Sequence, residues 1–139
     1  MADNLPNSFE VEIVTPDRLV VKDVAQEMQI PGSNGYLGIL LGHAPLITEL
    51  GVGEISYRKN GSSAHLAVAW GFAEVLPTKV TILAETAERA EEIDVARAER
   101  AKERAESRLK EAQPDTDFRR AQVCLERAII RIQVAEKRQ

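Results

Sequence analysis

The second half of this 139-residue chain contains no glycine and only one proline. All eight glycines and five of the six prolines lie before Thr86, whereas residues 87–139 contain ten alanines and ten arginines. Because glycine and proline mark turns, their near absence excludes a turn-rich β structure there and predicts helices. We therefore expect two structures joined end to end, residues 1–86 and residues 87–139.

Cysteine is also scarce. Cys124 is the only one, which excludes an intramolecular disulfide. Its neighbours Val123 and Leu125 indicate a small buried apolar side chain in a reducing compartment, rather than a reactive thiol.

Signals for secretion and membrane insertion are missing as well. The first six residues contain neither basic residues nor an apolar run, which argues against a secretory signal and predicts a cytoplasmic protein. The longest uncharged stretch, Met28–Thr48, is interrupted by two prolines and four glycines, which excludes a membrane-spanning helix. Any membrane association is therefore expected to go through a partner, without direct insertion.

The charges exclude further classes. The net charge is −4, with five basic against ten acidic residues in 1–86 and thirteen against twelve in 87–139, so neither half resembles a nucleic-acid-binding protein. No nucleophile with a base, no pair of catalytic carboxylates and no metal-binding cluster stands out, and His43 and His65 alone are a weak metal signal. We expect no enzyme activity, no metal site and no required cofactor.

The first half reads as short strands. The predicted strands are Phe9–Val14, Ala25–Ile30, Glu54–Arg58, His65–Ala69, Phe72–Leu76 and Val80–Ala84, with turn residues between them. Asn60-Gly61 is the dipeptide favoured where both turn residues need positive φ, so it predicts a β-hairpin. Turn signals recur about every 8 to 12 residues, which predicts a β-sandwich or barrel; we expect eight to ten strands in two packed sheets.

The second half reads as an antiparallel α-helical hairpin. Asp94 is a good N-cap, and Pro114 with Asp115 and Asp117 separates the two helices. The apolar stripes are Val95, Ala98, Ala101, Ala105, Leu109 and Ala112 in the first helix, and Phe118, Ala121, Leu125, Ala128, Ile132 and Ala135 in the second. Alanine buries little area, so we expect a marginally stable hairpin that is suited to act as a switch.

Several arginines of the hairpin have no acidic neighbour three or four residues away, among them Arg104, Arg127 and Arg131. Such stacks of like charge repel one another unless an anionic group lies among them. That group is either a ligand or, as in many helical hairpins, the glutamates of the facing helix. The spacing alone leaves both alternatives open.

The stretch Gly38–Thr48, GILLGHAPLIT, resembles the signature of the epsilon subunit of bacterial F-type ATP synthases. The resemblance extends through Gly51-Val52-Gly53 and Gly71–Val75 into Ile93–Ala98, and it covers essentially the whole chain. Two departures are Leu41, where the family commonly has proline, and the loop Gly32–Tyr36, where some members carry an acidic residue.

The resemblance implies a ten-stranded β-sandwich followed by a helical hairpin, in a non-catalytic rotor subunit. It implies binding to the gamma subunit and the c-ring, coupling of proton or sodium-ion flow to ATP synthesis, and a peripheral position on the cytoplasmic face of the inner membrane. It further implies C-terminal helices that extend towards the alpha and beta subunits and inhibit ATP hydrolysis. If the resemblance is set aside, the sequence also permits a free-standing β-sandwich adaptor with a helical hairpin for protein–protein interaction.

Some family members bind ATP on the folded hairpin, through a motif matched here by Ile93, Asp94, Arg97 and Ala98. Further matching family positions are Glu88, Arg104, Arg127 and Arg131. The arginines suit phosphates, and Asp94 and Glu88 suit the adenine amino group or the ribose. The alternative is that the motif serves only as a helix cap and hairpin contact, with Asp94 capping and Arg97 pairing to it.

The resemblance also places rotor contacts on Asn34, Tyr36, His43 and Ala44, which we expect at one edge of the sandwich. His43 is then a turn residue rather than a metal ligand. Trp70 is expected in the core or at an interface rather than as a platform for a cofactor.

Overall fold

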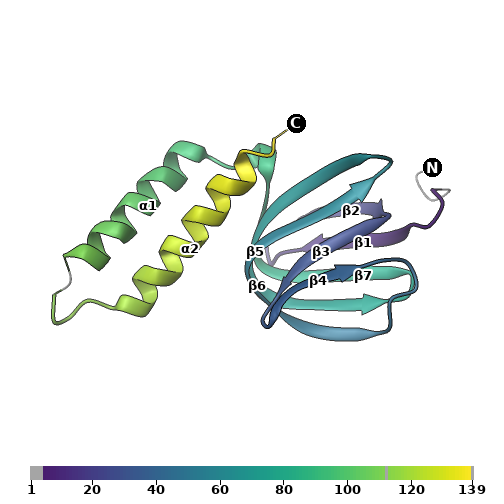
Figure 1. Cartoon of the computed structure of the whole chain (residues 1–139), viewed down its shortest axis with the longest axis horizontal. Helices are drawn as coiled ribbons and strands as arrows, with labels where there is room; N and C mark the ends of the chain where they lie inside the picture. The colour runs from purple at the N-terminus through teal and green to yellow at the C-terminus, as the bar shows by residue number, and fades with distance from the viewer. Residues whose placement is uncertain (1–4, 112, 139) are drawn as a thin grey trace.

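The computed structural model describes residues 5–111 and 113–138, which form a β-sandwich followed by two helices (Figure 1). The strands are β1 (Phe9–Val14), β2 (Leu19–Ala25), β3 (Glu27–Gly32), β4 (Gly35–Ile39), β5 (Leu46–Lys59), β6 (Ser62–Leu76) and β7 (Lys79–Arg89). A short 3-10 turn, η2 (Ala90–Glu92), leads to α1 (Val95–Lys110) and α2 (Phe118–Ala135). The predicted fold class, β-sandwich then helical hairpin, is confirmed.

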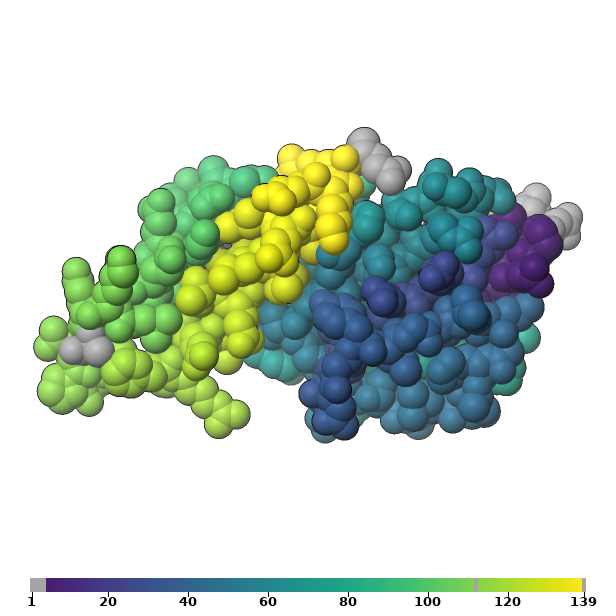
Figure 2. Space-filling view, in the orientation of Figure 1, coloured from purple at the N-terminus to yellow at the C-terminus, as the bar shows by residue number. Residues whose placement is uncertain are grey.

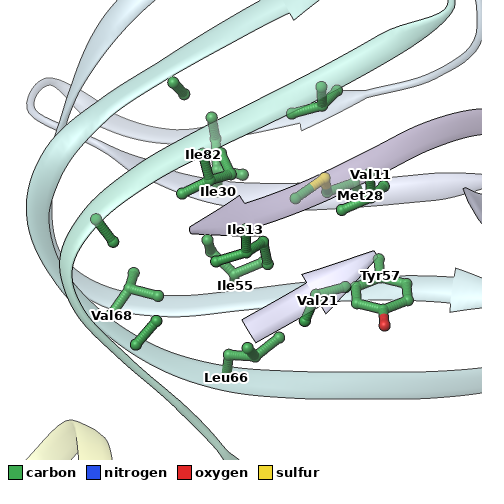
Figure 3. Packing of buried hydrophobic residues seen from close by; sticks show 14 of the residues in the cluster. Val11, Ile13, Val21, Met28, Ile30, Ile55, Tyr57, Leu66, Val68 and Ile82 are labelled. Carbon is green, nitrogen blue, oxygen red and sulfur yellow. The ribbon is translucent and has the colours of Figure 1, made fainter. Parts of the chain in front are cut away.

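The strands form one hydrogen-bonded sheet in the order β2-β1-β7-β6-β5-β3-β4. Strands β1 and β7 are parallel, and the other neighbouring pairs are antiparallel. The sheet curves around a single core, as Figure 3 shows. Side chains at the centre of this core include Ile13, Met28, Ile30, Ile55, Leu66 and Ile82.

The described residues contain seven strands rather than eight to ten, because the later strands are long and continuous. The predicted strands His65–Ala69 and Phe72–Leu76 are both parts of the 15-residue β6. Strand β7 likewise extends the predicted Val80–Ala84 through Arg89, so Thr86, the expected boundary, lies inside a strand.

Strand β6 bends at Trp70 and Gly71 but remains paired with its neighbours on both sides of the bend. The φ angles of these two residues are 53° and 119°, and a Cβ atom on Gly71 would lie 1.9 Å from the carbonyl oxygen of Leu83. Core-facing residues are even-numbered before the bend, as in Val68, and odd-numbered after it, as in Ala73. The bend therefore shifts the alternation by one residue while the register with β5 and β7 is kept, and sequence periodicity reads such a shift as the end of a strand.

The predicted β-hairpin at Asn60-Gly61 is present between β5 and β6. Both turn residues have positive φ, 51° for Asn60 and 80° for Gly61. This conformation suits the twist of two antiparallel strands joined by a two-residue turn.

The two helices begin at aspartate caps. The Asp94 carboxylate accepts a hydrogen bond from the Arg97 amide at 3.1 Å, and Asp117 accepts one from the Arg120 amide at 3.0 Å. The buried residues of the helices are mostly alanines, as predicted: Ala98 and Ala105 in α1, and Ala121, Ala128, Val134 and Ala135 in α2. Val95 and Phe118, at the helix starts, are exposed, and Ala112 lies outside the described residues.

Helix α2 lies between α1 and the sandwich (Figure 1), and its C-terminal end is docked. Val134 and Ala135 pack with Ala67 of β6, Ala90 of η2 and Ile93 in a small apolar cluster separate from the main core. The opposite end of the hairpin projects away from the sandwich (Figure 2). The attachment of the hairpin is therefore small and concentrated near its hinge.

Candidate functional site

A cleft of about 370 Å³ lies between the sandwich and the hairpin. It is lined by the β1–β2 turn, the end of β7 and both helices, through Thr15, Asp17, Arg18, Glu85, Thr86, Ala87, Glu88, Arg97, Arg127 and Arg131. Four predicted nucleotide-binding residues are thus brought together: Glu88, Arg97, Arg127 and Arg131. The four arginines of the lining outnumber its three carboxylates, which favours an anionic ligand.

Arg131 pairs with Glu88 across the cleft. Arg131 Nη2 donates to Glu88 Oε2 at 3.1 Å, and Arg131 Nε lies 2.8 Å from Oε1. The Nε contact lacks the alignment of a hydrogen bond, so this buried donor has no hydrogen-bond partner among the described residues. The helical spacing suggested that Arg131 is unpaired, but it has an acidic partner. This partner, Glu88, comes from the sandwich rather than from the facing helix.

Arg127 also has a partner in the sandwich. Its guanidinium carbon lies 5.3 Å from the centroid of the Trp70 ring, a cation–π geometry. Trp70 is half-buried at this interface, in agreement with its predicted role. The helical-spacing argument missed this partner because the bend in β6 orients Trp70, and nothing in the helix indicates it.

The other predicted nucleotide-binding residues lie apart from the cleft lining. Ile93 and Ala98 are buried, at 2% and 0% exposure, and support the hinge and the helix contact. Asp94 caps α1 through the Arg97 amide, while the Arg97 side chain has no ion pair with it among the described residues. Arg104 is exposed two turns further along α1, about 10 Å from Arg97.

The four predicted rotor-contact residues follow the edge strand β4 but divide into two pairs. Asn34 and Tyr36 are at its start, and His43 and Ala44 lie in the loop beyond its end. All except the half-buried His43 are exposed. Because β4 is extended at about 3.3 Å per residue, the two pairs lie at opposite ends of this strand.

The loop that carries His43 belongs to an exposed apolar tip. The Gly42 amide donates to the Pro77 carbonyl at 2.8 Å, which joins this loop to the β6–β7 turn. The exposed side chains of the tip are Leu40, Leu41, Leu46, Ile47 and Leu76. Grouped exposed leucines of this kind mark interaction surfaces, and residue-by-residue matching did not identify them.

Two basic residues at the end of α2 fasten the hairpin to the sandwich, and we call Lys137 and Arg138 the C-terminal clasp. Lys137 Nζ lies 2.6 Å from Glu54 Oε1, and the other oxygen of Glu54 lies 2.6 Å from His65 Nδ1. Arg138 donates to the carbonyl oxygens of Ala90 and Ile93, on either side of the hinge turn. Helical periodicity in the sequence does not indicate the clasp, because Lys137 and Arg138 lie after the last turn of α2.

A second polar cluster joins β2 to β5. Asp23 accepts hydrogen bonds from Lys59 Nζ at 2.8 Å and Tyr57 Oη at 3.1 Å. Burial raises the pKa of Asp23, but the hydrogen bonds from Lys59, the Val24 amide and Tyr57 together outweigh it and hold this pKa below its ordinary value. Burial, reinforced by the charge of Asp23, raises the pKa of Tyr57 to about 12.

Comparison with known proteins decides the family. The beta-sandwich domain of the ATP synthase delta/epsilon chain matches residues 8–90, and the long alpha-helix domain of the same chain matches residues 91–136. The chain belongs to the ATP synthase delta/epsilon chain family. As an epsilon chain of the bacterial F-type enzyme it is a non-catalytic subunit, in agreement with the absence of a catalytic constellation in the sequence.

Relatives named "ATP synthase epsilon chain" align over most of their length. The protein from Koribacter versatilis is 71% identical over 80% of this chain and 78% of its own. The one from Geotalea daltonii is 48% identical over 96% of this chain and 97% of its own.

The fold also matches chains in two solved structures. One is from the Euglena gracilis mitochondrial ATP synthase, OSCP/F1/c-ring, with TM-score 0.75 and 22% identity over 88% of this chain and 78% of that one. The other is from the central stalk/c-ring of the Tetrahymena thermophila mitochondrial ATP synthase, with TM-score 0.58 and 10% identity. This match covers 91% of this chain and 96% of that one. In the part of this epsilon chain that the structure describes, we find no helix with the length and apolarity needed to cross a membrane.

Proposed function

We propose that this epsilon chain works in the rotor of ATP synthase, bound to the gamma subunit and the c-ring on the cytoplasmic face of the inner membrane. In this position it couples ion flow to ATP synthesis without catalysing a reaction. The family membership supports this role, and the structural neighbours come from F1/c-ring and central stalk/c-ring assemblies.

The sandwich provides the docking surfaces in this proposal. The apolar tip offers Leu40, Leu41 and Ile47 to a partner, and His43 and Ala44 are in the same loop. Asn34 and Tyr36 form a second contact at the other end of β4. We assign partner binding to the sandwich, residues 1–86 together with the end of β7, and regulation to the hairpin.

The hairpin is the inhibitory element. Its helices bury mainly alanines, and among the described residues its attachment to the sandwich rests chiefly on the apolar cluster near the hinge, the clasp and the arginine contacts. Because these contacts are few, an extended form that reaches the alpha and beta subunits is accessible in free energy. In that form the helices block ATP hydrolysis.

ATP is the regulatory ligand of the folded hairpin. The single observation that supports this is the gathering of Arg97, Arg127, Arg131 and Glu88 in one cleft whose walls come from both the sandwich and the hairpin. A ligand held by both walls binds only the folded form, and at a hundred times its dissociation constant it favours that form by about 2.7 kcal/mol. ATP therefore opposes inhibition, and no cofactor is required for this.

Reconstitution into an ATP synthase lacking epsilon tests the rotor role. A chain ending at Arg89, which keeps all of β7, should bind gamma and the c-ring but should not inhibit hydrolysis. Replacing Tyr36 and His43 together by Asp should uncouple ion pumping while the sandwich stays folded, with only the small loss of stability expected from removing the hydrogen bond that the Glu54 amide donates to the Tyr36 hydroxyl. If the full chain fails to co-purify with the ATPase, the free-standing adaptor is the better description.

A further inference from the structure

Trp70 lies where the hairpin diverges from the sandwich. Beside it is an opening of about 420 Å³, lined by Trp70 and, on the α2 side, by Val123, Cys124 and Arg127 among others. Arg127 also lines the arginine-rich cleft proposed for ATP. Arg127 therefore connects the two openings, and through it the Trp70 ring can influence the arginine-rich cleft.

The backbone of Trp70 is in a costly conformation. A φ of 53° is unusual for a residue with a bulky side chain, and such conformations persist where the surroundings impose them, often at functional sites. The ring does not pack in a hydrophobic core, because Trp70 belongs to neither of the two clusters of buried hydrophobic residues. The ring faces the guanidinium of Arg127.

The kind of contact matters for the ligand. A cation–π contact attracts the guanidinium to the face of the ring without supplying a counter-charge or an acceptor oxygen, so the N–H donors are not taken by a carboxylate and remain open to a phosphate. A carboxylate partner, such as Glu88 at Arg131, occupies those donors and neutralises the charge. The ring therefore orients Arg127 while its positive charge and its donors remain available.

We propose that Trp70 is a positioning residue of the nucleotide site, which holds Arg127 ready for the phosphates of ATP. This rests on the proposed function, since it assigns a further residue to the same site. Trp70 acts through Arg127 and does not itself touch the nucleotide.

Calorimetric titration of the full chain with ATP tests the proposal. Trp70→Ala should weaken binding about three- to tenfold, the equivalent of one cation–π contact. Trp70→Phe, which keeps an aromatic face, should retain most of the affinity. Phe72→Ala is the matched control, because Phe72 is an exposed aromatic residue on the same strand and outside the cleft lining.

A double-mutant cycle separates positioning from general packing. In an Arg127→Ala background, Trp70→Ala should cause no further loss, because the residue through which it acts is gone. Trp70 is the only tryptophan of the chain, so its emission reports the contact directly. Arg127→Ala should change this emission in the absence of nucleotide while the melting temperature of the sandwich stays constant.

The outcomes distinguish this proposal from the ATP sensor itself. No heat of binding with the unsubstituted chain overturns both. If Trp70→Ala leaves ATP binding unchanged, the positioning role is overturned and the sensor stands. The same holds if Trp70→Ala weakens binding equally in the unsubstituted chain and in the Arg127→Ala chain. If Trp70→Ala does not fold by circular dichroism, Trp70→Leu replaces it: this variant keeps a bulky apolar side chain but loses the aromatic face, and it should weaken ATP binding by a similar three- to tenfold.

Discussion

Arg131 of α2 and Glu88 of β7 form a two-point ion pair although 43 positions separate them in the sequence. The pair crosses the cleft between the hairpin and the sandwich, so it contributes to docking of the hairpin. A phosphate that binds Arg131 has to share it with Glu88 or displace it. The first prediction follows from this competition.

Arg131→Ala should weaken ATP binding about tenfold or more, since it removes a charge-assisted contact but no core volume. Calorimetry on the full chain measures the loss, and thermal melting of the sandwich should be unchanged. Arg108→Ala is the control, because Arg108 is exposed on α1 and outside the cleft lining. Equal losses from both substitutions would show that ATP responds to overall charge rather than to this cleft.

The C-terminal clasp should control how often the hairpin opens. Lys137→Ala removes the contact with Glu54 at the docked end of α2, so amide hydrogens of both helices should exchange faster while those of β1 and β7 do not. In the assembled enzyme the same variant should inhibit hydrolysis more strongly. Lys110→Ala, at the exposed end of α1, serves as the control. Unchanged exchange in α2 would assign the docking to the apolar cluster alone.

Asp23 should make the sandwich sensitive to acid. Its pKa in the folded protein is lowered, so its contribution to stability is present above the unfolded value of about 3.9 and is lost as the pH falls through the folded value. Asp23→Asn should cost about 1 to 2 kcal/mol at pH 7. Urea unfolding from pH 7 to pH 2 should show the two proteins converge below about pH 4. A difference that is constant down to pH 2 would contradict this.

Gly71→Ala should destabilise the sandwich strongly. The added Cβ would lie 1.9 Å from a backbone oxygen, and the φ of 119° is itself unfavourable for alanine. We expect a loss of about 3 kcal/mol or more in the free energy of unfolding. Gly38→Ala is the comparison, because a Cβ there meets nothing within 4 Å. A small loss at Gly71 would mean that the bend relaxes without it.

The sequence predicts the fold class because its signals are local. Asn60-Gly61 specifies its turn, and Asp94 and Asp117 cap their helices, through interactions that span only a few residues. The number of strands was overestimated because the bend at Trp70 resets the alternation within one strand. No rule based on period two distinguishes such a bend from a loop.

The site is predictable only in part. Arg127 and Arg131 stand out because their own helix gives them no acidic partner, but Trp70 and Glu88 are partners brought in from distant strands. Arg18 and Asp17 reach the cleft from the β1–β2 turn, where charged residues are ordinary and give no signal. The placement of Glu54 near His65 follows from the hairpin register, since both lie on one face of neighbouring strands.

The parallel pairing of β1 with β7 sets the order in which this protein is built. Strand β1 has only β2 beside it until residues 79–89 leave the ribosome, because its second neighbour is the last strand of the sheet. The growing chain therefore carries an open edge through most of its synthesis, and such edges invite pairing with other chains. The sandwich closes as one late event, and the helices emerge onto a platform that has just been completed.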